Sequence, residues 1–276
     1  MPWQACLKLD YRVERERTVA RHQHEGPLRI LRSLYPEGGT VCHTILVHPP
    51  GGLVGGDTLD LHIGVGADAH GLITTPGATR FYRSDGALAL QRTRIDLAPR
   101  ARLEWLPLET ICHNGCQAEN SLTLQLAPGA EFMGLDITAL GLPHAGQPFE
   151  TGRFLQHIDV PGVWLEHGQI DASDHRLLRG RGGLGGHACL GAFFFVAGSP
   201  ISRARRDTAL ELARGLIAAH PLHPTAGASA VNDQVLVVRV LAPMVESAMA
   251  LLRQIWRLWR AQLWDRAAEA PRIWAT

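Results

Sequence analysis

Acidic residues set among apolar ones are the side chains of this sequence best suited to contact a cation. A strand acid of this kind either faces solvent, often in a salt bridge, or is buried at a considerable energetic cost unless it has a partner. Several of them on one scaffold could instead line a path for a divalent cation, because single carboxylates bind it weakly. Both interpretations stay open for each of the four candidates, Asp57, Glu109, Asp136 and Glu166.

A second candidate for metal chemistry is the pair Cys112 and Cys116, with His113 directly after the first cysteine. Two thiolates and an imidazole could hold a soft or borderline cation. No second Cys or His pair follows at the spacing of a structural zinc site, so such a site is not predicted. A turn with two ordinary cysteines is the alternative.

The sequence contains no recognisable catalytic motif. The glycine-rich residues 51–57 lack the Lys-Ser or Lys-Thr of a phosphate-binding loop, and there is no G-x-S-x-G, H-E-x-x-H or dinucleotide-binding pattern. Residues 179–186 resemble a glycine-arginine RNA-binding segment, but they lack interleaved aromatic residues and the chain has a net charge of only +1. We therefore expect a protein that is not an enzyme, has no nucleic-acid partner, and forms a flexible loop at 179–186.

The composition is that of a globular protein, with 276 residues, 46% apolar and 19% charged. The five cysteines are odd in number and lack framework spacing, which indicates reduced thiols. No stretch reaches the roughly eighteen uncharged apolar residues of a membrane span, and residues 1–10 lack a secretory apolar core. We expect a cytoplasmic protein without a membrane partner, with a single domain over residues 1–276.

Short apolar or alternating runs bounded by Gly, Pro, Asn and Asp predict strands through the first two hundred residues. The predicted strands are 40–48, 59–65, 71–75, 88–97, 102–106, 121–126, 131–140, 154–160, 163–170 and 188–196.

A turn motif recurs among these strands. The sequence LAPRA at 97–101 is echoed by LAPGA at 126–130 and more loosely at 160–163 and 65–69. With Ala67, Pro99, Pro128 and Pro161 taken as equivalent, the spacings are 32, 29 and 33. A period near 30 predicts stacked strand-turn-strand units, although any β protein can repeat its turn chemistry. The predicted fold is mainly β, with a solenoid-like scaffold over about 1–200 and a helix-containing part over about 201–276.

The C-terminal part contains two predicted helices, at 207–220 and 244–266, around a predicted strand at 235–241. Thr208 and Glu211 are placed as a capping box for the first helix. The second follows Pro243 and has an apolar stripe that includes Trp256 and Trp259, with its arginines 253, 257 and 260 on another face. Such a stripe is typical of a core, and a partner surface is the alternative.

Two glycine-containing motifs, HPPGGLVGGD at 48–57 and TTPGATRFYRS at 74–84, support a family resemblance. Together with LEWLPLETI at 103–111 and PRIW at 271–274, they occur in the order found in urease accessory proteins of the UreD (UreH) family. The chain resembles that family from about residue 45 to its end. The motif residues are Gly51, Gly52, Gly55, Gly56, Pro76, Gly77, Thr79, Arg80 and Tyr82.

The resemblance implies a β-helical fold and a non-catalytic role in urease maturation. Similar proteins act with UreF and the GTPase UreG on the urease apoenzyme and deliver nickel to its di-nickel site through a water-filled passage. Asp57, Asp136 and Glu166 look like acids associated with that passage. We expect transient nickel, no tightly bound cofactor, and contact with UreF through the C-terminal region.

The sequence departs from the family at Leu108, where Gln is usual, and at Leu142, where Arg is usual. Two other classes of function remain as alternatives. One is a metal-dependent hydrolase that uses scattered acids and some of the 14 histidines; the other is a purely structural adaptor. The metal content of the isolated protein separates the hydrolase from the rest, because a hydrolase retains a stoichiometric ion.

Overall fold

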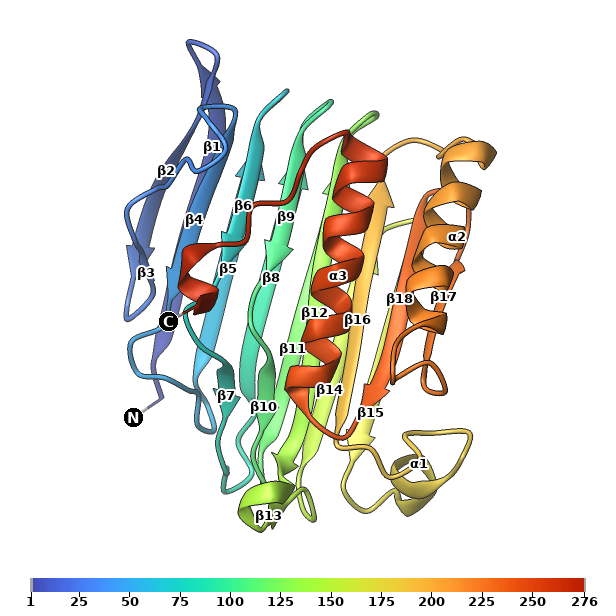
Figure 1. Cartoon of the computed structure of the whole chain (residues 1–276). Coiled ribbons are helices and arrows are strands. Elements are labelled where there is room, and N and C mark those ends of the chain that lie inside the picture. The colour runs from blue at the N-terminus through green and yellow to red at the C-terminus, as the bar shows by residue number, and fades with distance from the viewer. Residues whose placement is uncertain (1, 276) are drawn as a thin grey trace.

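The computed structural model describes residues 2–275 and contains two β-sheets stacked face to face, with two long helices on one side (Figure 1). The seven-stranded sheet has the order β15-β14-β11-β8-β5-β1-β2. Its strands are β1 (Gln4–Glu14), β2 (Arg17–Glu25), β5 (Thr58–Val65), β8 (Ala89–Leu97), β11 (Gln117–Leu126), β14 (Arg153–Val160) and β15 (Trp164–Asp171).

The eleven-stranded sheet has the main order β17-β18-β16-β12-β9-β6-β4-β3, with β7, β10 and β13 beside this path. Its strands are β3 (Arg29–Ile30), β4 (Val41–Val47), β6 (His70–Thr74), β7 (Thr79–Phe81), β9 (Arg102–Leu106), β10 (Thr110–Cys112), β12 (Glu131–Leu142), β13 (Gln147–Pro148), β16 (Cys189–Ala197), β17 (Ala226–Ala230) and β18 (Val235–Ala242). Each of the ten strand ranges predicted for the first two hundred residues coincides with a strand.

The centre of the fold is a solenoid-like stack of coils, which confirms the predicted fold class. The chain passes from one sheet to the other at β5 to β6, β8 to β9 and β11 to β12, and each new strand pairs in parallel with the equivalent strand of the coil before. Strands β17 and β18 extend the eleven-stranded sheet, so the C-terminal part completes the scaffold instead of standing beside it.

The repeated turn motif forms the corners between the sheets at three of its four predicted positions. Asp68, Arg100 and Gly129 have positive φ at these corners, and the Arg100 guanidinium binds Asp68 through two hydrogen bonds of 2.7 Å. The fourth position, at 160–163, instead closes an antiparallel hairpin between β14 and β15 within one sheet. The prediction of a fourth corner was wrong, because a Pro-Gly turn suits a hairpin as well as a corner.

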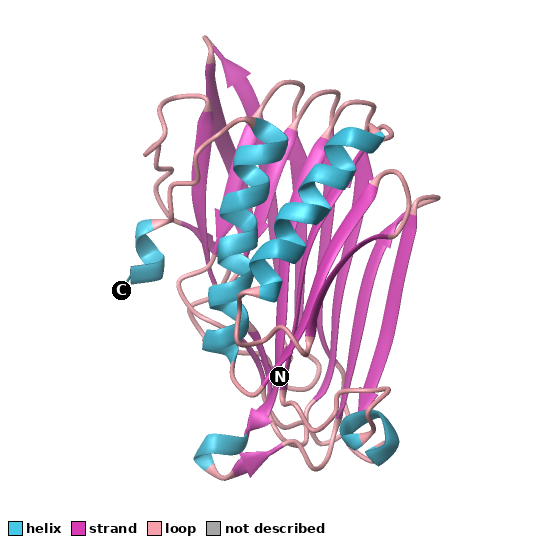
Figure 2. Cartoon of the chain, turned by 45° about the vertical axis from the view of Figure 1, so that its right-hand side comes forward, coloured by secondary structure: helices cyan, strands magenta, loops and turns pink. Residues whose placement is uncertain are grey.

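Two long helices, α2 (Arg203–Ala218) and α3 (Val245–Trp264), cover the outer face of the eleven-stranded sheet (Figure 2). The short elements are α1 (His175–Arg179) and the 3-10 turns η1 (Pro143–Ala145) and η2 (Arg272–Ala275). Helix α2 begins before the predicted residue 207 because Ser202 is its N-cap, so the predicted capping box was wrong. Within residues 2–275, no helix combines the length and apolar character that a membrane crossing requires.

The apolar stripe of α3 lies in the core, since Trp256 and Trp259 are almost completely buried. Arg260, which was predicted on a face other than the apolar stripe, is also fully buried. Arg179 of the segment 179–186 ends α1, and residues 180–186 form successive turns closed by backbone hydrogen bonds, among them Leu184 N to Leu177 O at 2.7 Å.

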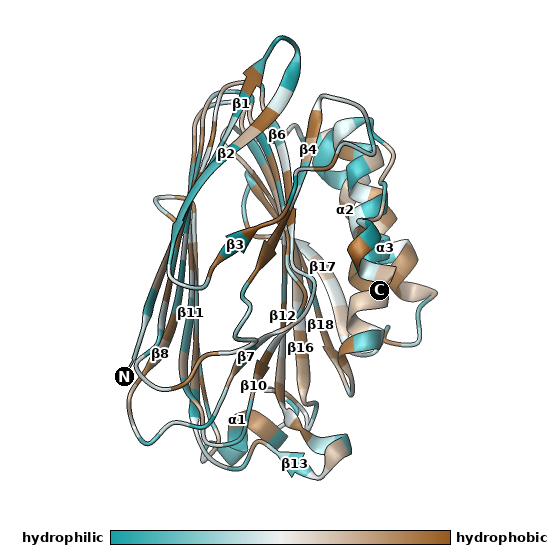
Figure 3. Cartoon of the chain, turned by 90° about the vertical axis from the view of Figure 1, so that its left-hand side faces the viewer, coloured by the Kyte–Doolittle hydropathy of each residue, from teal (hydrophilic) through white to brown (hydrophobic). Residues whose placement is uncertain are grey.

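The fold has two hydrophobic cores, one between the sheets and one between the eleven-stranded sheet and the helices (Figure 3). Strand β12 belongs to both, because its side chains alternate in direction. Phe132 and Leu140 lie in the core between the sheets, whereas Met133, Leu135 and Ile137 lie in the core beneath the helices. The same alternation directs Asp136 into the space between the sheets.

Candidate functional site

Asp136 is an acid inside the core between the sheets. It accepts a hydrogen bond from the Gln156 amide of β14, on the opposite sheet. Burial raises the pKa of Asp136 to about 6; the Gln156 hydrogen bond opposes this rise and the charge of nearby Glu166 adds to it. The carboxyl group is therefore ionised at neutral pH although no Lys or Arg within residues 2–275 forms an ion pair with it.

Glu166 connects this buried acid with the open edge of the sandwich. It lies on β15, the last strand of the seven-stranded sheet, and forms an ion pair with Arg239 of β18. Arg239 and Asp136 lie in one row of the eleven-stranded sheet, each in register with Ala192 of β16. The Glu166 side chain is 34% exposed, so the group runs from the interior to solvent.

Further polar side chains continue from Asp136 into the sandwich. Gln91, Asn120 and Gln156 are aligned in register across β8, β11 and β14. Facing them, Thr79 and Thr110 are aligned across β7 and β10. We call these six residues the polar layer: Thr79, Gln91, Thr110, Asn120, Asp136 and Gln156.

The polar layer contains a cavity of about 20 Å³ that is lined by Thr79, Gln91, Thr110, Asn120 and Asp136 among others. This volume is enough for about one water molecule. Within the described part of the chain, Gln156 Oε1 and Thr93 Oγ1 are buried without a hydrogen-bond partner. Buried oxygens of this kind normally bind a water molecule or an ion.

Asp57 lies in a different place from Asp136. Its two carboxylate oxygens accept hydrogen bonds from the backbone N–H groups of Trp3, at 3.2 Å, and Val54, at 3.0 Å. The residue is 1% exposed and closes the turn at 51–57. Sequence reasoning grouped Asp57 with Asp136 and Glu166, whereas the structure brings only the latter two together.

The two glycine-containing motifs pack against each other. Leu53 donates a backbone hydrogen bond to Arg80 O at 2.7 Å, and Tyr82 N donates to Leu53 O at 2.8 Å. A Cβ on Gly52 would lie 2.3 Å from the Tyr82 ring, and one on Gly55 would lie 2.1 Å from Ser84 Oγ. Gly51 and Gly56 have positive φ, which glycine adopts readily. In the second motif, Pro76, Gly77 and Arg80 are exposed to solvent. Most motif residues therefore shape this junction, and Thr79 also reaches the polar layer.

Replacing Gly52 with alanine should destabilise the protein by about 1–3 kcal/mol, because the new methyl group would overlap the Tyr82 ring and the Arg80 carbonyl. Gly77 is the matched control from the second motif, since a Cβ there has no neighbour within 4 Å and its φ is not positive. Urea unfolding of Gly52→Ala and Gly77→Ala measures both effects. Equal midpoints for the two variants would contradict the tight junction.

The chain matches a known protein family over almost its whole length. A family model described as UreD urease accessory protein matches residues 4–275. The chain belongs to the UreD family of urease accessory proteins. Similar proteins, each named urease accessory protein UreD, include those of Verminephrobacter eiseniae (66% identical over 275 residues), Variovorax paradoxus (64% over 276) and Leptothrix cholodnii (50% over 278), and each match covers 100% of both chains.

Membership of the UreD family assigns the chain a role in urease maturation. The family description is that of an accessory factor, which implies interaction with urease and other accessory proteins.

The cysteine pair of this UreD-family chain is buried. Cys112 and Cys116 are both 0% exposed, and burial raises the pKa of the Cys112 thiol well above its ordinary value. His113 stacks on Tyr82, with ring centres 4.8 Å apart. Among residues 2–275, no three His, Cys, Asp or Glu side chains are grouped so that they could hold a metal ion. The pair is therefore placed as part of the core, next to the junction of the two motifs.

Glu109 lies in a separate groove of about 690 Å³ beside the start of α3. Burial and the charge of Glu109 raise the pKa of Cys189 in this groove to about 12. Leu108 and Leu142, the two departures from the UreD pattern, also line it. Both substitutions therefore change the same surface and make it more apolar.

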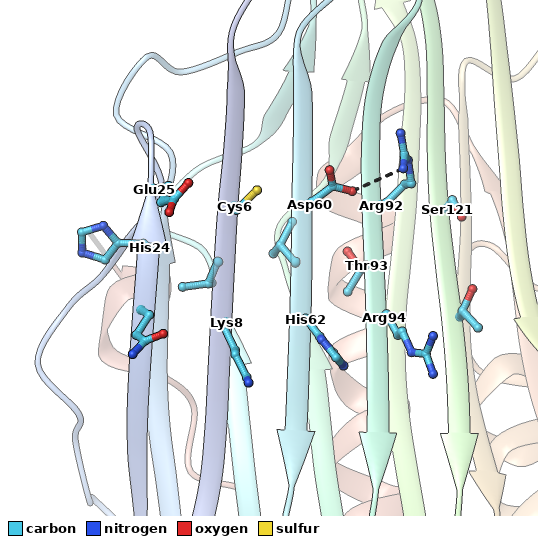
Figure 4. Close-up of a pocket in the computed structure, with 14 residues that line it drawn as sticks. Cys6, Lys8, His24, Glu25, Asp60, His62, Arg92, Thr93, Arg94 and Ser121 are labelled. Carbon is cyan, nitrogen blue, oxygen red and sulfur yellow. Dashed lines mark ion pairs between the residues drawn. The ribbon is translucent and has the colours of Figure 1, made fainter.

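The outer face of the seven-stranded sheet contains a third hollow, of about 740 Å³ (Figure 4). Its charged side chains are largely paired with one another or with near neighbours. Asp60 lies 3.7 Å from Arg92, and His62 and Arg94 both contact Asp96, at 2.8 and 3.3 Å. Because these charged groups already have partners within the sheet, they are less available to a ligand than the unpartnered oxygens near the polar layer.

Sequence reasoning missed a buried charge cluster that fastens α3 to the sheet. Glu104 of β9, which is 0% exposed, contacts His70 Nε2 at 2.8 Å, Trp256 Nε1 at 2.6 Å and Arg260 Nε at 3.1 Å. Arg260 also donates to Glu37 at 2.6 Å. Glu104 has the same signal as Asp136, an acid between apolar strand residues, and Arg260 follows Trp256 by one helical turn.

Proposed function

We propose that this UreD-family chain is a non-catalytic scaffold that delivers nickel during urease maturation. It acts with UreF and UreG on the urease apoenzyme, and Ni²⁺ passes between the two sheets along the polar layer. The observation that supports this most is the ionisable Asp136 within the polar layer between the sheets, with Glu166 between it and solvent.

The chemistry of the polar layer suits passage better than storage. Asp136 offers a carboxylate, Gln91, Asn120 and Gln156 offer amide oxygens, and the threonines offer hydroxyl groups. These are hard, neutral or singly charged oxygen ligands, and Ni²⁺ prefers nitrogen and sulfur. An ion that meets one carboxylate at a time is held weakly and can move on.

The size of the cavity adds a requirement. A space of about 20 Å³ holds about one water molecule, which is less than the full hydration shell of Ni²⁺. We therefore propose that oxygens of the polar layer replace water ligands stepwise, or that the layer widens when UreF and urease bind.

Replacing Asp136 with alanine should leave the complex with UreF, UreG and urease intact but should yield urease with several-fold less nickel and activity. Co-expression with the urease subunits, co-purification, and nickel analysis of the isolated urease measure this. Asp60→Ala is the matched control, because Asp60 is an acid on the outer face of the seven-stranded sheet. Full nickel loading in Asp136→Ala would contradict the proposal.

The C-terminal region is proposed to contact UreF through its exposed face. Deletion of residues 244–276 does not test this, because it removes Trp256 and Trp259 from the core. Substitution at the exposed Arg257 of α3 is the better test, since it changes the surface and leaves the buried stripe unchanged.

A further inference from the structure

Two histidines face each other on the outer side of the β14–β15 hairpin. His157 and His167 are directly opposite in register, and their ring centres lie 5.3 Å apart with the ring planes tilted by 43°. His157 is partly exposed and His167 is exposed. Within residues 2–275, neither imidazole has a hydrogen bond or an ion pair, so their ring nitrogens are available to a ligand.

The separation of the two rings fits a shared metal ion. An imidazole nitrogen binds a transition metal at roughly 2.1 Å, which puts the ring centre roughly 3.2 Å from the ion. Ring centres that are 5.3 Å apart are close enough for both imidazoles to reach one ion, since twice the distance from ring centre to ion is roughly 6.4 Å. Directly opposed residues of an antiparallel pair are also held at a fixed distance by the backbone, so little has to be ordered when the ion binds.

Another histidine pair in the chain lacks this geometry. His22 and His24 lie on one strand, their rings are 6.0 Å apart and nearly parallel at 15°, and His24 contacts Arg29 at 3.2 Å. The wider ring separation and the Arg29 contact make this pair less suited to share an ion. This pair serves as an internal control.

The surroundings of His157 and His167 favour a cation. Asp159 is the next outward residue of β14, and the uncharged Ser121 of β11 is in register with His157. Arg92, one strand further, lies near Asp60. Imidazole is a ligand that Ni²⁺, Cu²⁺ and Zn²⁺ accept readily.

We propose that His157 and His167 form a two-imidazole binding site for a divalent transition-metal ion, with Ni²⁺ as the ion in the cell and water in the remaining positions. The residues beside them in sequence, Gln156 and Glu166, face the interior on the same two strands. Because β15 is an edge strand, an ion on the outer face is separated from Glu166 only by the edge of the sheet. An ion bound here could move on to Glu166 and into the polar layer. That role rests on the proposed nickel passage, whereas metal binding by the two histidines does not.

Titration of the full-length chain with NiCl₂, followed by calorimetry and by broadening of histidine side-chain NMR signals, tests the site. Ni²⁺ should broaden the signals of His157 and His167 first. Either His157→Ala or His167→Ala should weaken binding at this site tenfold or more, because one imidazole alone forms no chelate. His22→Ala should leave it unchanged. Melting curves establish that the exposed substitutions keep the fold.

A loss of less than twofold in both variants, or an equal loss in His22→Ala, would overturn the site. Nickel loading of urease then separates this inference from the proposed function. If Asp136→Ala lowers urease nickel while His157→Ala neither binds Ni²⁺ more weakly nor lowers urease nickel, the passage stands and the histidine site is refuted. If His157→Ala weakens binding while Asp136→Ala loads urease fully, the site stands and the passage is refuted.

Discussion

Replacing Glu104 with glutamine should lower the free energy of unfolding by about 3–5 kcal/mol, the range observed when one partner of a buried ion pair is removed. Glu104 and Arg260 are both 0% exposed, and the substitution leaves the Arg260 guanidinium with Glu37 as its remaining carboxylate partner. The hydrogen bonds from His70 and Trp256 also change from charged to neutral acceptors. Denaturant unfolding monitored by tryptophan fluorescence measures the loss, because Trp256 belongs to the cluster.

The pH dependence of this effect has a defined sign. Burial alone would raise the pKa of Glu104, but the hydrogen bond and charge of His70 and the charge of Arg260 lower it below its ordinary value of 4.5. Because the pKa of Glu104 is lowered in the folded protein, its contribution to the free energy of unfolding is complete above about pH 4.5. This contribution is lost as the pH falls through the pKa that Glu104 has in the folded protein. The difference in free energy of unfolding between wild type and Glu104→Gln should therefore become smaller at acidic pH.

Asp68→Asn is the control for this experiment. Asp68 has two hydrogen bonds of 2.7 Å to Arg100, but both side chains are more than half exposed. Exposed ion pairs contribute little, because water solvates the separated charges well. A Glu104→Gln protein as stable as Asp68→Asn would show that the cluster does not fasten α3.

Replacing Asp136 with asparagine should have the opposite effect on stability and should make the protein more stable at pH 7–8. Burial raises the pKa of Asp136 from its ordinary 3.8 to about 6. The folded protein therefore binds this proton more tightly than the unfolded chain, so the wild type loses stability as the pH rises from about 4 to 6. Asparagine keeps an oxygen for the Gln156 hydrogen bond without the buried charge.

The expected gain in the free energy of unfolding is about 2–3 kcal/mol at neutral pH. It follows from the rise in the pKa of Asp136, because each pKa unit corresponds to about 1.4 kcal/mol. It should disappear below about pH 4, where both states of the wild type are protonated. Urea unfolding of wild type and Asp136→Asn from pH 4 to 8 measures it, with the partly exposed Asp60→Asn as control. An unchanged or lower stability at pH 7–8 would show that the buried carboxylate has a stabilising partner. A gain in stability together with poorer nickel loading would indicate that Asp136 is kept for function at the expense of stability.

Much of the scaffold follows from local sequence. Alternating apolar residues and Pro-Gly or Gly-Asp turns predicted the strands, since a strand that buries one face needs period-two alternation wherever it lies. The spacing near 30 predicted the stacked coils, because each coil repeats the same corner. The apolar stripe of α3 likewise predicted a buried helix, and Trp256 and Trp259 are buried.

Other features depended on which strands become neighbours. The turn at 160–163 has the chemistry of the corner turns, but it closes a hairpin because β15 pairs back onto β14. Residues 4–25 form β1 and β2 and were not predicted as strands, although residues 4–11 have the period-two alternation of a strand. Only the parallel pairing of β1 with β5 lies beyond the local pattern. Arg260 lies one helical turn after the buried Trp256, but no local pattern shows that Glu104 and Glu37 lie beneath it as partners for its buried charge.

The candidate site shows the same division. Asp57, Asp136 and Glu166 have the same sequence signal, an acid beside apolar strand residues, so composition and spacing could not rank them. The tertiary structure separates them, because the backbone N–H groups of Trp3 and Val54 bind Asp57. Register across β12, β16 and β18 instead places Asp136 in one row with Arg239, the partner of Glu166, and the facing sheet brings Gln156 to Asp136. The sequence determined which residues could contact a cation. Only the pairing of strands far apart in the chain decided which of them meet, since the direction of each side chain is local but its neighbours are not.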